Sequence, residues 1–242
     1  MTYLEEPGPS LKLYHEQVMT LYKTQGIVFN FIKYKETSII CRIFTEKFGM
    51  RSYMIKGIRR KKSNIAFYQP LTQLELLVTE RENRDIQQIR EAKVAYAYAE
   101  IPYEIKKTSI ALFLAEVLYK SVREESAQED LFAFITESLM RFDALSVATE
   151  NFHLQFLLKL SRFLGFGLSE VRPFFEQTGR IALPNADAEA LVNKLLHQDY
   201  GTPIHLNGQI RRQLLQNILR FYNLNLESFG RVRSLEVLQS LF

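Results

Sequence analysis

The spacing of apolar residues changes once along the chain, and this change constrains the fold more than any other feature. Between residues 21 and 98 apolar side chains recur at every second position, as in Ile27, Phe29 and Phe31, which is the period of a half-buried strand. After Pro102 the period becomes about 3.6, which is that of an amphipathic helix. The sequence therefore predicts an α+β protein in which a β domain precedes an α-helical domain.

Five runs in the first part have the length and alternation of strands, and polar or basic turns separate them. Five such strands fit a five-stranded Greek-key barrel, the oligonucleotide-binding (OB) fold, whose exposed face and loops hold single strands. We expect the strands at about Leu21–Ile32, Ser38–Thr45, Arg51–Ile58, Leu71–Thr79 and Ile86–Tyr98.

The second part contains helical patterns separated by one stretch, Gly167 to Pro184, that is interpreted as a loop. In the first pattern Ile105 and Leu112 belong to the apolar stripe and Lys107 lies outside it. Asn151 is a plausible N-cap of the third helix, which we expect to close at Gly165. The predicted helices cover about residues 105–118, 131–139, 152–164, 186–197, 207–222 and 234–241.

Positive charge is concentrated in the predicted strands. Between Leu21 and Lys62 there are eleven Lys and Arg but only Glu36 and Glu46 as acids, a net charge of +9. The whole chain is only +4, so the remaining residues carry a net charge of −5. Fixed cations on a folded surface suit a polyanion, because each neutralised phosphate releases condensed counterions. We therefore expect a nucleic acid as the partner.

The sharpest cluster runs from Arg59 to Lys62, which we interpret as a basic loop against the DNA backbone, with a solvated turn as the alternative. Aromatic residues among these cations can stack on bases. Core packing is the preferred interpretation for most of them, Phe29 included, whereas Tyr34 lies in a turn beside two lysines. The candidate DNA-binding residues are Lys23, Lys33, Lys35, Arg42, Arg51, Lys56, Arg59, Arg60, Lys61, Lys62 and Tyr34, and the other aromatic residues considered are Tyr53, Phe67 and Tyr68.

Other classes of protein find little support in the sequence. It has no Gly-rich phosphate loop, no HExxH and no G-x-S-x-G motif, and Cys41 and His153 are expected to be packed, so we expect no enzyme and no cofactor. The apolar stretches are shorter than the roughly 20 residues that span a bilayer. With Cys41 alone no internal disulfide can form, and we expect a cytoplasmic location. Residues 1–18 lack the apolar core of a signal peptide and are interpreted as a loose extension before Met19.

Three segments carry a resemblance to a known family. Residues 24–63, TQGIVFNFIKYKETSIICRIFTEKFGMRSYMIKGIRRKKS, resemble the opening of the bacterial recombination mediator family RecO, with its E-T-S turn and later KG-x-R. The resemblance continues in KKTSIALFLAEVLYKSVREE (106–125) and NFHLQFLLKLSRFLGF (151–166). It implies an OB barrel, a helical body, binding of single- and double-stranded DNA, strand annealing, and cooperation with RecR to load RecA on protein-coated strands.

The resemblance also implies that the helical body binds the acidic, Phe-terminated tail of single-stranded-DNA-binding protein. A basic rim around an apolar pocket would suit such a tail, and we assign Arg211 and Arg212 to it. One departure concerns zinc: many relatives carry paired Cys-x-x-Cys motifs after the third helix, where this chain has GFGLSEVRPFFEQTGRIALP (165–184). We expect a metal-free protein, because His153, His197 and His205 lack the number and spacing of zinc ligands, and we expect burial of Phe166, Phe174, Phe175 and Ile181 instead.

The sequence thus predicts an extension (1–18), an OB domain (19–100) and a helical domain (101–242) with a cysteine-free loop at about 167–184. The expected function is that of a non-enzymatic recombination mediator in DNA repair. Two alternatives stay open. One is an OB-fold protein that binds RNA, because phosphate contacts do not distinguish RNA from DNA, and the other is a protein-interaction adaptor without DNA binding.

Overall fold

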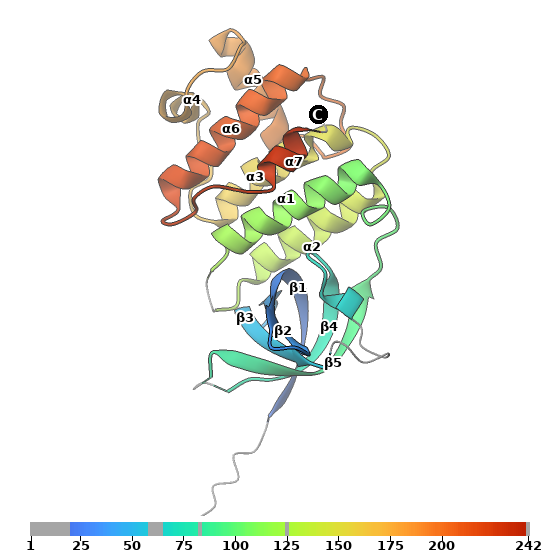
Figure 1. Cartoon of the computed structure of the whole chain (residues 1–242). Helices are drawn as coiled ribbons and strands as arrows, with labels where there is room; N and C mark the ends of the chain where they lie inside the picture. Colours follow the sequence, from blue (N-terminus) through green and yellow to red (C-terminus); the bar gives the residue numbers. More distant parts are fainter. Residues whose placement is uncertain (1–19, 58–64, 82–83, 124–125, 241–242) are drawn as a thin grey trace, which may run out of the picture.

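Five strands close a barrel at the start of the chain (Figure 1). The computed structural model describes residues 20–57, 65–81, 84–123 and 126–240. The strands pair in the order β1-β2-β3-β5-β4, and all pairs are antiparallel except β3 with β5. The predicted five-stranded barrel is confirmed, with strand ends within two residues of the expected ones. The strands are β1 (Leu21–Tyr34), β2 (Ser38–Thr45), β3 (Gly49–Lys56), β4 (Gln73–Thr79) and β5 (Ile86–Tyr96), with a 3-10 turn η1 (Ile65–Tyr68) before β4.

Closure of the barrel depends on the length of β1, which pairs with β4 through its first half and with β2 through its second. Gly26 lies where the two pairings overlap, opposite Thr45 on one side and Leu74 on the other. A Cβ atom at Gly26 would lie 2.7 Å from Ile43 Cγ2 and 2.9 Å from Leu76 Cδ1. Only glycine therefore allows the strands to approach this closely.

The barrel interior is a compact apolar cluster, as the alternation in the sequence predicts. It includes Val28, Ile43 and Tyr53, and it also encloses Cys41, which is completely buried. Burial raises the pKa of the Cys41 thiol to about 12. The expectation that this cysteine is packed in a strand is confirmed.

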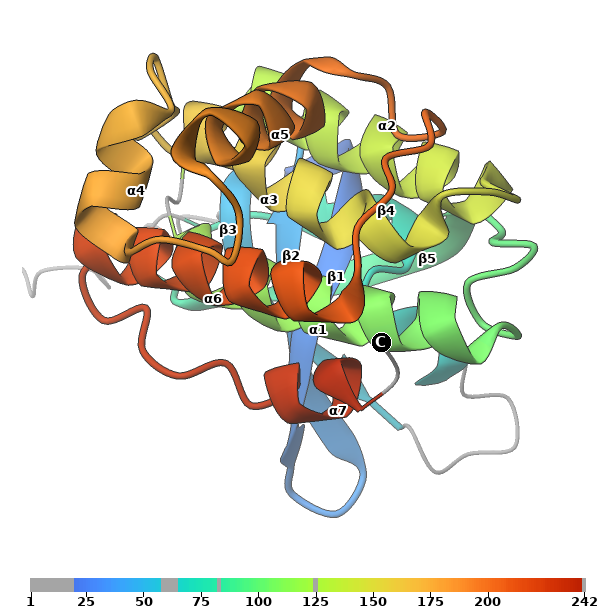
Figure 2. The same ribbon diagram turned by 90° about the horizontal axis from the view of Figure 1, so that it is seen from above.

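The helical body lies on one end of the barrel, as the view from above shows (Figure 2). α1 and α2 are the helices next to the barrel, and α7 lies beside α1. α4, α5 and α6 form the side away from the strands. The helices are α1 (Ile105–Ser121), α2 (Glu129–Ala144), α3 (Phe152–Phe163), α4 (Arg172–Thr178), α5 (Asn185–His197), α6 (Gly208–Asn225) and α7 (Leu235–Gln239), with a 3-10 turn η2 (Thr149–Asn151) before α3.

The stretch 167–184, expected to be a loop, contains the helix α4. Pro173 lies in its first turn, where a missing backbone N–H costs nothing, and Gly179 ends it with a positive φ of 100°. The expected burial of four apolar residues in and next to this stretch is confirmed. Phe174 and Ile181 are buried, and Phe166 and Phe175 pack against the same core in partly buried positions.

The predicted face of α1 was partly wrong. Ile105 is 72% exposed and Leu112 is 48% exposed, although both were placed in the apolar stripe. Lys107, expected outside the stripe, is only 2% exposed. The reason lies in the junction with the barrel, where Lys107 Nζ donates to Glu100 Oε2 at 2.5 Å and to the Asp143 carbonyl at 2.7 Å.

The barrel interior is a separate apolar cluster, but the helix-facing side of the barrel belongs to the same apolar core as the helices. The rings of Phe44 in β2 and Phe132 in α2 lie 5.9 Å apart, and both belong to a cluster that extends to the C-terminal helices. At the junction the buried Asp143 carboxylate accepts hydrogen bonds from the backbone N–H groups of residues 99, 100 and 101, at 2.8 to 2.9 Å. Burial by itself raises the pKa of Asp143, but these bonds and nearby Lys107 outweigh it, so the pKa is lowered. The barrel is thus fixed relative to the helical body.

Candidate nucleic-acid interface

β1, β2 and β3 present one continuous surface away from the barrel interior. Successive side chains of a strand point to opposite sides, and the pairing register aligns the outward ones in rows across the strands. We call this surface the β1–β3 outer face. Its first row is Asn30, Arg42 and Ser52, its second row is Ile32, Ile40 and Met54, and its third row is Tyr34, Ser38 and Lys56.

The charged side chains of this face are all cationic. Arg42 Nη1 donates to Ser52 Oγ at 2.8 Å, a neutral partner that leaves the guanidinium charge uncompensated. Lys56 is exposed, and so are Lys33 and Lys35 at the adjoining end of the β1–β2 hairpin. In the described part of the chain no carboxylate forms an ion pair with these four cations. The structure therefore places two of the predicted DNA-binding cations, Arg42 and Lys56, on this face, with Lys35 in the adjoining turn. Lys33 lies opposite Ile39, on the strand side that faces the barrel interior.

Tyr34 is the aromatic residue of this face. It is 37% exposed, and Lys35 Nζ lies 5.5 Å from its ring centroid. The other aromatic candidates are not available for stacking on bases to the same degree. Tyr53 and Tyr68 are buried, Phe67 is half-buried against the barrel core, and the interpretation of Phe29 as a core residue is confirmed.

Arg51, also predicted as a DNA contact, belongs to the inner side of β3. It lies opposite Ile43, and its Nε is 3.3 Å from Glu80 Oε2. Tyr53 donates its hydroxyl to the other oxygen of the same carboxylate, at 2.6 Å. Burial, and then the contact with Glu80, raises the pKa of the Tyr53 phenol. The structure places the Arg51 charge in an internal ion pair rather than on the β1–β3 outer face.

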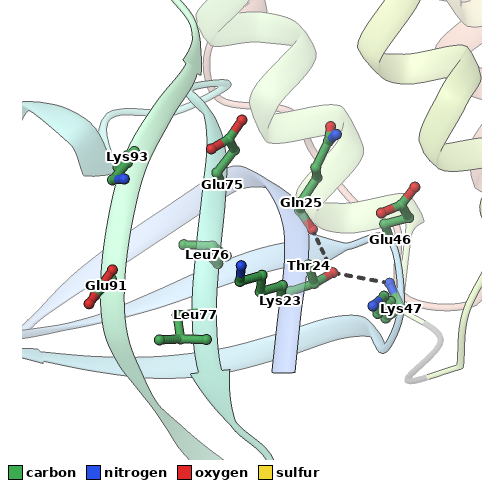
Figure 3. Close-up of a pocket in the computed structure, with 10 residues that line it drawn as sticks. All are labelled: Lys23, Thr24, Gln25, Glu46, Lys47, Glu75, Leu76, Leu77, Glu91 and Lys93. Carbon is green, nitrogen blue, oxygen red and sulfur yellow. Dashed lines mark hydrogen bonds between the residues drawn. The ribbon is translucent and has the colours of Figure 1, made fainter. Parts of the chain in front are cut away.

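Lys23 lies on a different surface, in a cleft of about 380 Å³ across β1, β4 and β5 (Figure 3). The register places Lys23 beside Leu77 and Glu91, and Glu75 beside Lys93. Three lysines and three glutamates line this cleft, so its formal charge is zero. We call it the β1–β4–β5 cleft, and its lining residues are Lys23, Thr24, Gln25, Glu46, Lys47, Glu75, Leu76, Leu77, Glu91 and Lys93.

Four predicted cations, Arg59, Arg60, Lys61 and Lys62, lie outside the described residues. They begin three positions after Lys56, the last residue of β3, which belongs to the third row of the β1–β3 outer face.

The two arginines predicted to bind a partner have different environments on α6. Arg211 Nε donates to Asn151 Oδ1 at 3.1 Å and its Nη2 to the Leu206 carbonyl at 3.0 Å, and burial lowers its pKa. Asn151 is buried and donates to the Ile204 carbonyl, so its side chain does not cap α3 as predicted. Arg212 is exposed. Arg211 thus connects the start of α3 to the segment before α6.

A second hollow, of about 680 Å³, lies between α2, α3 and α5, and sequence reasoning missed it. Its floor includes Phe134 and Phe163, whose rings stack at a centroid distance of 4.5 Å. Its lining includes exposed Arg162 and also Lys159, whose Nζ donates to the Gln198 carbonyl at 2.7 Å. The signal that could have found it is Phe163, an apolar residue at the end of a helix, which is 36% exposed. We call it the α3 pocket, lined by Phe134, Leu158, Lys159, Arg162, Phe163, Gly165, Gly167, Leu168, Ser169, Leu196 and His197.

His153 lies in the core of α3, 1% exposed and edge-on to the Phe113 ring, as the core interpretation predicts. Burial, with a smaller effect of Arg211, lowers its pKa to about 3. No group of three or more potential metal ligands occurs in the described residues. Within the same residues no helix is both long and apolar enough to cross a membrane.

Comparison with known proteins gives matches along most of the chain. The family model for the N-terminal part of recombination protein O matches residues 19–98, and that for its C-terminal part matches residues 102–172. The chain is 34% identical to the DNA repair protein RecO of Bacteroides fragilis over 92% of this chain and 99% of that protein. It is also 34% identical to the RecO of Flavobacterium psychrophilum, over 91% of this chain and 98% of that protein.

Proposed function

This chain belongs to the RecO family of DNA repair proteins, and from this premise we propose that it is a non-enzymatic recombination mediator. Membership supports a role in DNA repair and recombination. The proposed activity has three parts: binding of single- and double-stranded DNA, annealing of complementary strands, and loading of RecA on coated single strands together with RecR.

One observation carries the DNA-binding part of the proposal, namely that the three rows of the β1–β3 outer face contain cations and no carboxylate. Arg42 and Lys56 stand on the face, and the adjoining end of the β1–β2 hairpin carries Lys33, Lys35 and one exposed acid, Glu36. Each cation that meets a phosphate releases condensed counterions and adds about 0.7 to 0.9 to the salt slope of the affinity. The segment 59–62 follows β3 and adds four further cations in sequence. We exclude Lys23 and Arg51 from the proposed DNA-binding site, because glutamates lie beside both of them.

Annealing follows from the same electrostatics. Two complementary strands repel each other through their phosphates, and neutralisation on a cationic surface lowers this repulsion so that base pairing can proceed. The step makes and breaks no covalent bond of the DNA and needs no nucleotide hydrolysis.

For the tail of single-stranded-DNA-binding protein we propose the α3 pocket in place of the surface around Arg211. The stacked Phe134 and Phe163 rings offer an apolar floor for a terminal Phe, and Arg162 lies at the edge for the acidic residues. Arg211 is unsuited, because its guanidinium already donates to Asn151 and to a backbone carbonyl. Arg212 stays in the proposal as an exposed cation of the same body.

The decisive experiment is annealing of complementary oligonucleotides coated with single-stranded-DNA-binding protein, in the absence of ATP. We expect acceleration, and we expect it to disappear when Arg59, Arg60, Lys61 and Lys62 are replaced by Ala together with Arg42→Gln. Wild-type protein that binds its protein partners but accelerates nothing would favour the adaptor alternative. Tighter binding to an RNA oligomer than to the DNA oligomer of equal sequence would favour the RNA alternative.

A further inference from the structure

The second row of the β1–β3 outer face is apolar. Ile32 is 57% exposed, and Ile40 and Met54 are half-buried. None of the three belongs to either apolar core cluster of the molecule. Neither the barrel interior nor the helical body therefore explains why three apolar side chains line up across neighbouring strands and meet the solvent.

The rows on both sides of this strip carry cations. Arg42 lies in the first row and Lys56 in the third, each two residues along the strand from the apolar row. With a rise of about 3.4 Å per residue the cations lie about 7 Å away on either side. Tyr34, in the third row on the same strand as Ile32, adds an exposed aromatic ring at one end. An apolar strip between cations is suited to a ligand with an anionic backbone and flat apolar groups.

We propose that the strip of Ile32, Ile40 and Met54, extended by Tyr34, contacts the faces of unpaired bases while Arg42 and Lys56 hold the flanking phosphates. The inference rests on the proposed function, and it assigns to this apolar row the preference of the protein for single-stranded over double-stranded DNA. Base faces are accessible only in a single strand, since a duplex covers them by stacking and pairing. A duplex on the same surface keeps the phosphate contacts and loses the base contacts.

This difference gives the row a role in annealing. Two single strands bind through bases and phosphates, whereas the duplex that they form retains the phosphate contacts alone. The product therefore binds more weakly per nucleotide than the substrate, and it leaves the face once the bases have paired. A surface of cations alone would hold the more highly charged duplex at least as tightly as the strands.

Three ligands of equal length test the proposal: a thymine oligonucleotide, a single strand of abasic sites, and a duplex. The variant combines Ile32→Thr with Met54→Gln, and the control is Leu21→Thr, which removes a 49% exposed apolar side chain from the far end of the same strand. We expect the double variant to lose roughly tenfold in affinity for the thymine strand, the loss of one or more base contacts. Affinity for the abasic strand and the duplex should change by less than about twofold, and the control should behave as wild type.

Equal losses on the thymine and abasic strands would overturn the base contact. If the double variant kept wild-type affinity for all three ligands, the base contact would also be overturned. The apolar row would then be better explained as a contact surface for a protein partner. The gain-of-function variant Ile32→Tyr, at a solvent-facing position, serves if the double variant does not fold, and it should raise affinity for the thymine strand alone. The pair Arg42→Gln and Lys56→Gln should weaken all three ligands. If it weakens none, the proposed DNA site itself fails, however the row variants behave.

Discussion

On the β1–β3 outer face, Arg42 and Lys56 direct their charge toward solvent, whereas at the junction of barrel and helices the charge of Lys107 is used within the fold. Lys107 is 2% exposed and fixes the segment that leaves the barrel. The Arg51–Glu80 pair and the Arg211–Asn151 contact resemble the junction in this respect. The same residue types thus face solvent in one region, where we propose that they bind DNA, and form internal contacts in the other. The difference lies in what surrounds them.

The strongest test of the interior region is Asp143→Asn. The amide would place N–H groups among three backbone donors. It would also remove the negative charge near buried Lys107, whose own hydrogen bond to the residue 143 backbone carbonyl is retained. We expect a loss of about 3 to 4 kcal/mol in the free energy of unfolding, measured by chemical denaturation. DNA affinity of the folded fraction should remain that of wild type. A loss below about 1 kcal/mol would show that the junction does not depend on this carboxylate.

The same variant gives a pH dependence with a defined sign. The folded-state pKa of Asp143 is lowered, so its contribution is fully present above the unfolded pKa of about 3.9 and is lost as the pH falls through the folded value. The stability difference between wild type and Asp143→Asn should therefore be constant near neutral pH and decrease below pH about 4. A difference that grows with acidification would contradict the assignment.

For the outer region the sharpest variant replaces Lys33, Lys35, Arg42 and Lys56 with Gln. Loss of four phosphate contacts should lower the salt slope for a single strand by about 3 and the affinity at moderate salt by roughly a hundredfold. The matched control replaces Lys23, Lys47 and Lys93 with Gln in the β1–β4–β5 cleft, where each cation lies among glutamates. Titrations of a fluorescent oligonucleotide at several salt concentrations measure both. Equal losses in the two variants would remove the distinction between the surfaces.

Two neighbouring arginines on α6 provide a smaller test within one helix. Arg211→Ala removes the donor to Asn151 and to the Leu206 carbonyl, and we expect a loss of about 1 to 2 kcal/mol in unfolding free energy. Arg212→Ala removes an exposed side chain and should stay within about 0.5 kcal/mol. Thermal and urea unfolding of the two single variants measures both losses in unfolding free energy. A larger loss for Arg212→Ala than for Arg211→Ala would contradict our interpretation.

The smallest expected effect concerns Glu80→Gln, which removes the charge partner of Arg51 and keeps an acceptor for Tyr53. We expect a loss of about 1 kcal/mol in stability. The salt slope of DNA binding should not change, since Arg51 stays on the inner side of β3. A slope that rises by about one unit would mean that the freed guanidinium reaches a phosphate.

The sequence predicted the barrel well because alternation and turn residues are local signals. Strand β2 was predicted with its observed ends, and the burial of Cys41 follows from its place in the alternation. Alternation alone separates Arg42, which lies between buried Cys41 and Ile43, from Arg51, which is two positions before buried Tyr53. The ion pair of Arg51 could not be predicted, because Glu80 lies 29 positions away along the chain.

The errors in the helical part have a similar cause. Lys107 follows a polar pattern, but its burial depends on Asp143, 36 positions away along the chain. The α3 pocket combines residues of α2, α3 and α5, so no local pattern could predict it. Helix α4 is short, and its stability comes from burial of Phe174 rather than from an amphipathic repeat.

The core that runs without interruption from Phe44 to the C-terminal helices has a mechanical consequence. Since the shared core prevents the barrel from moving as a separate body against the helices, the distance between the β1–β3 outer face and the α3 pocket stays constant. A partner that occupies both sites gains from tethering only when its own flexible segment spans that fixed interval. The length of that segment, rather than any hinge in this protein, would then decide whether strand and tail are held at the same time.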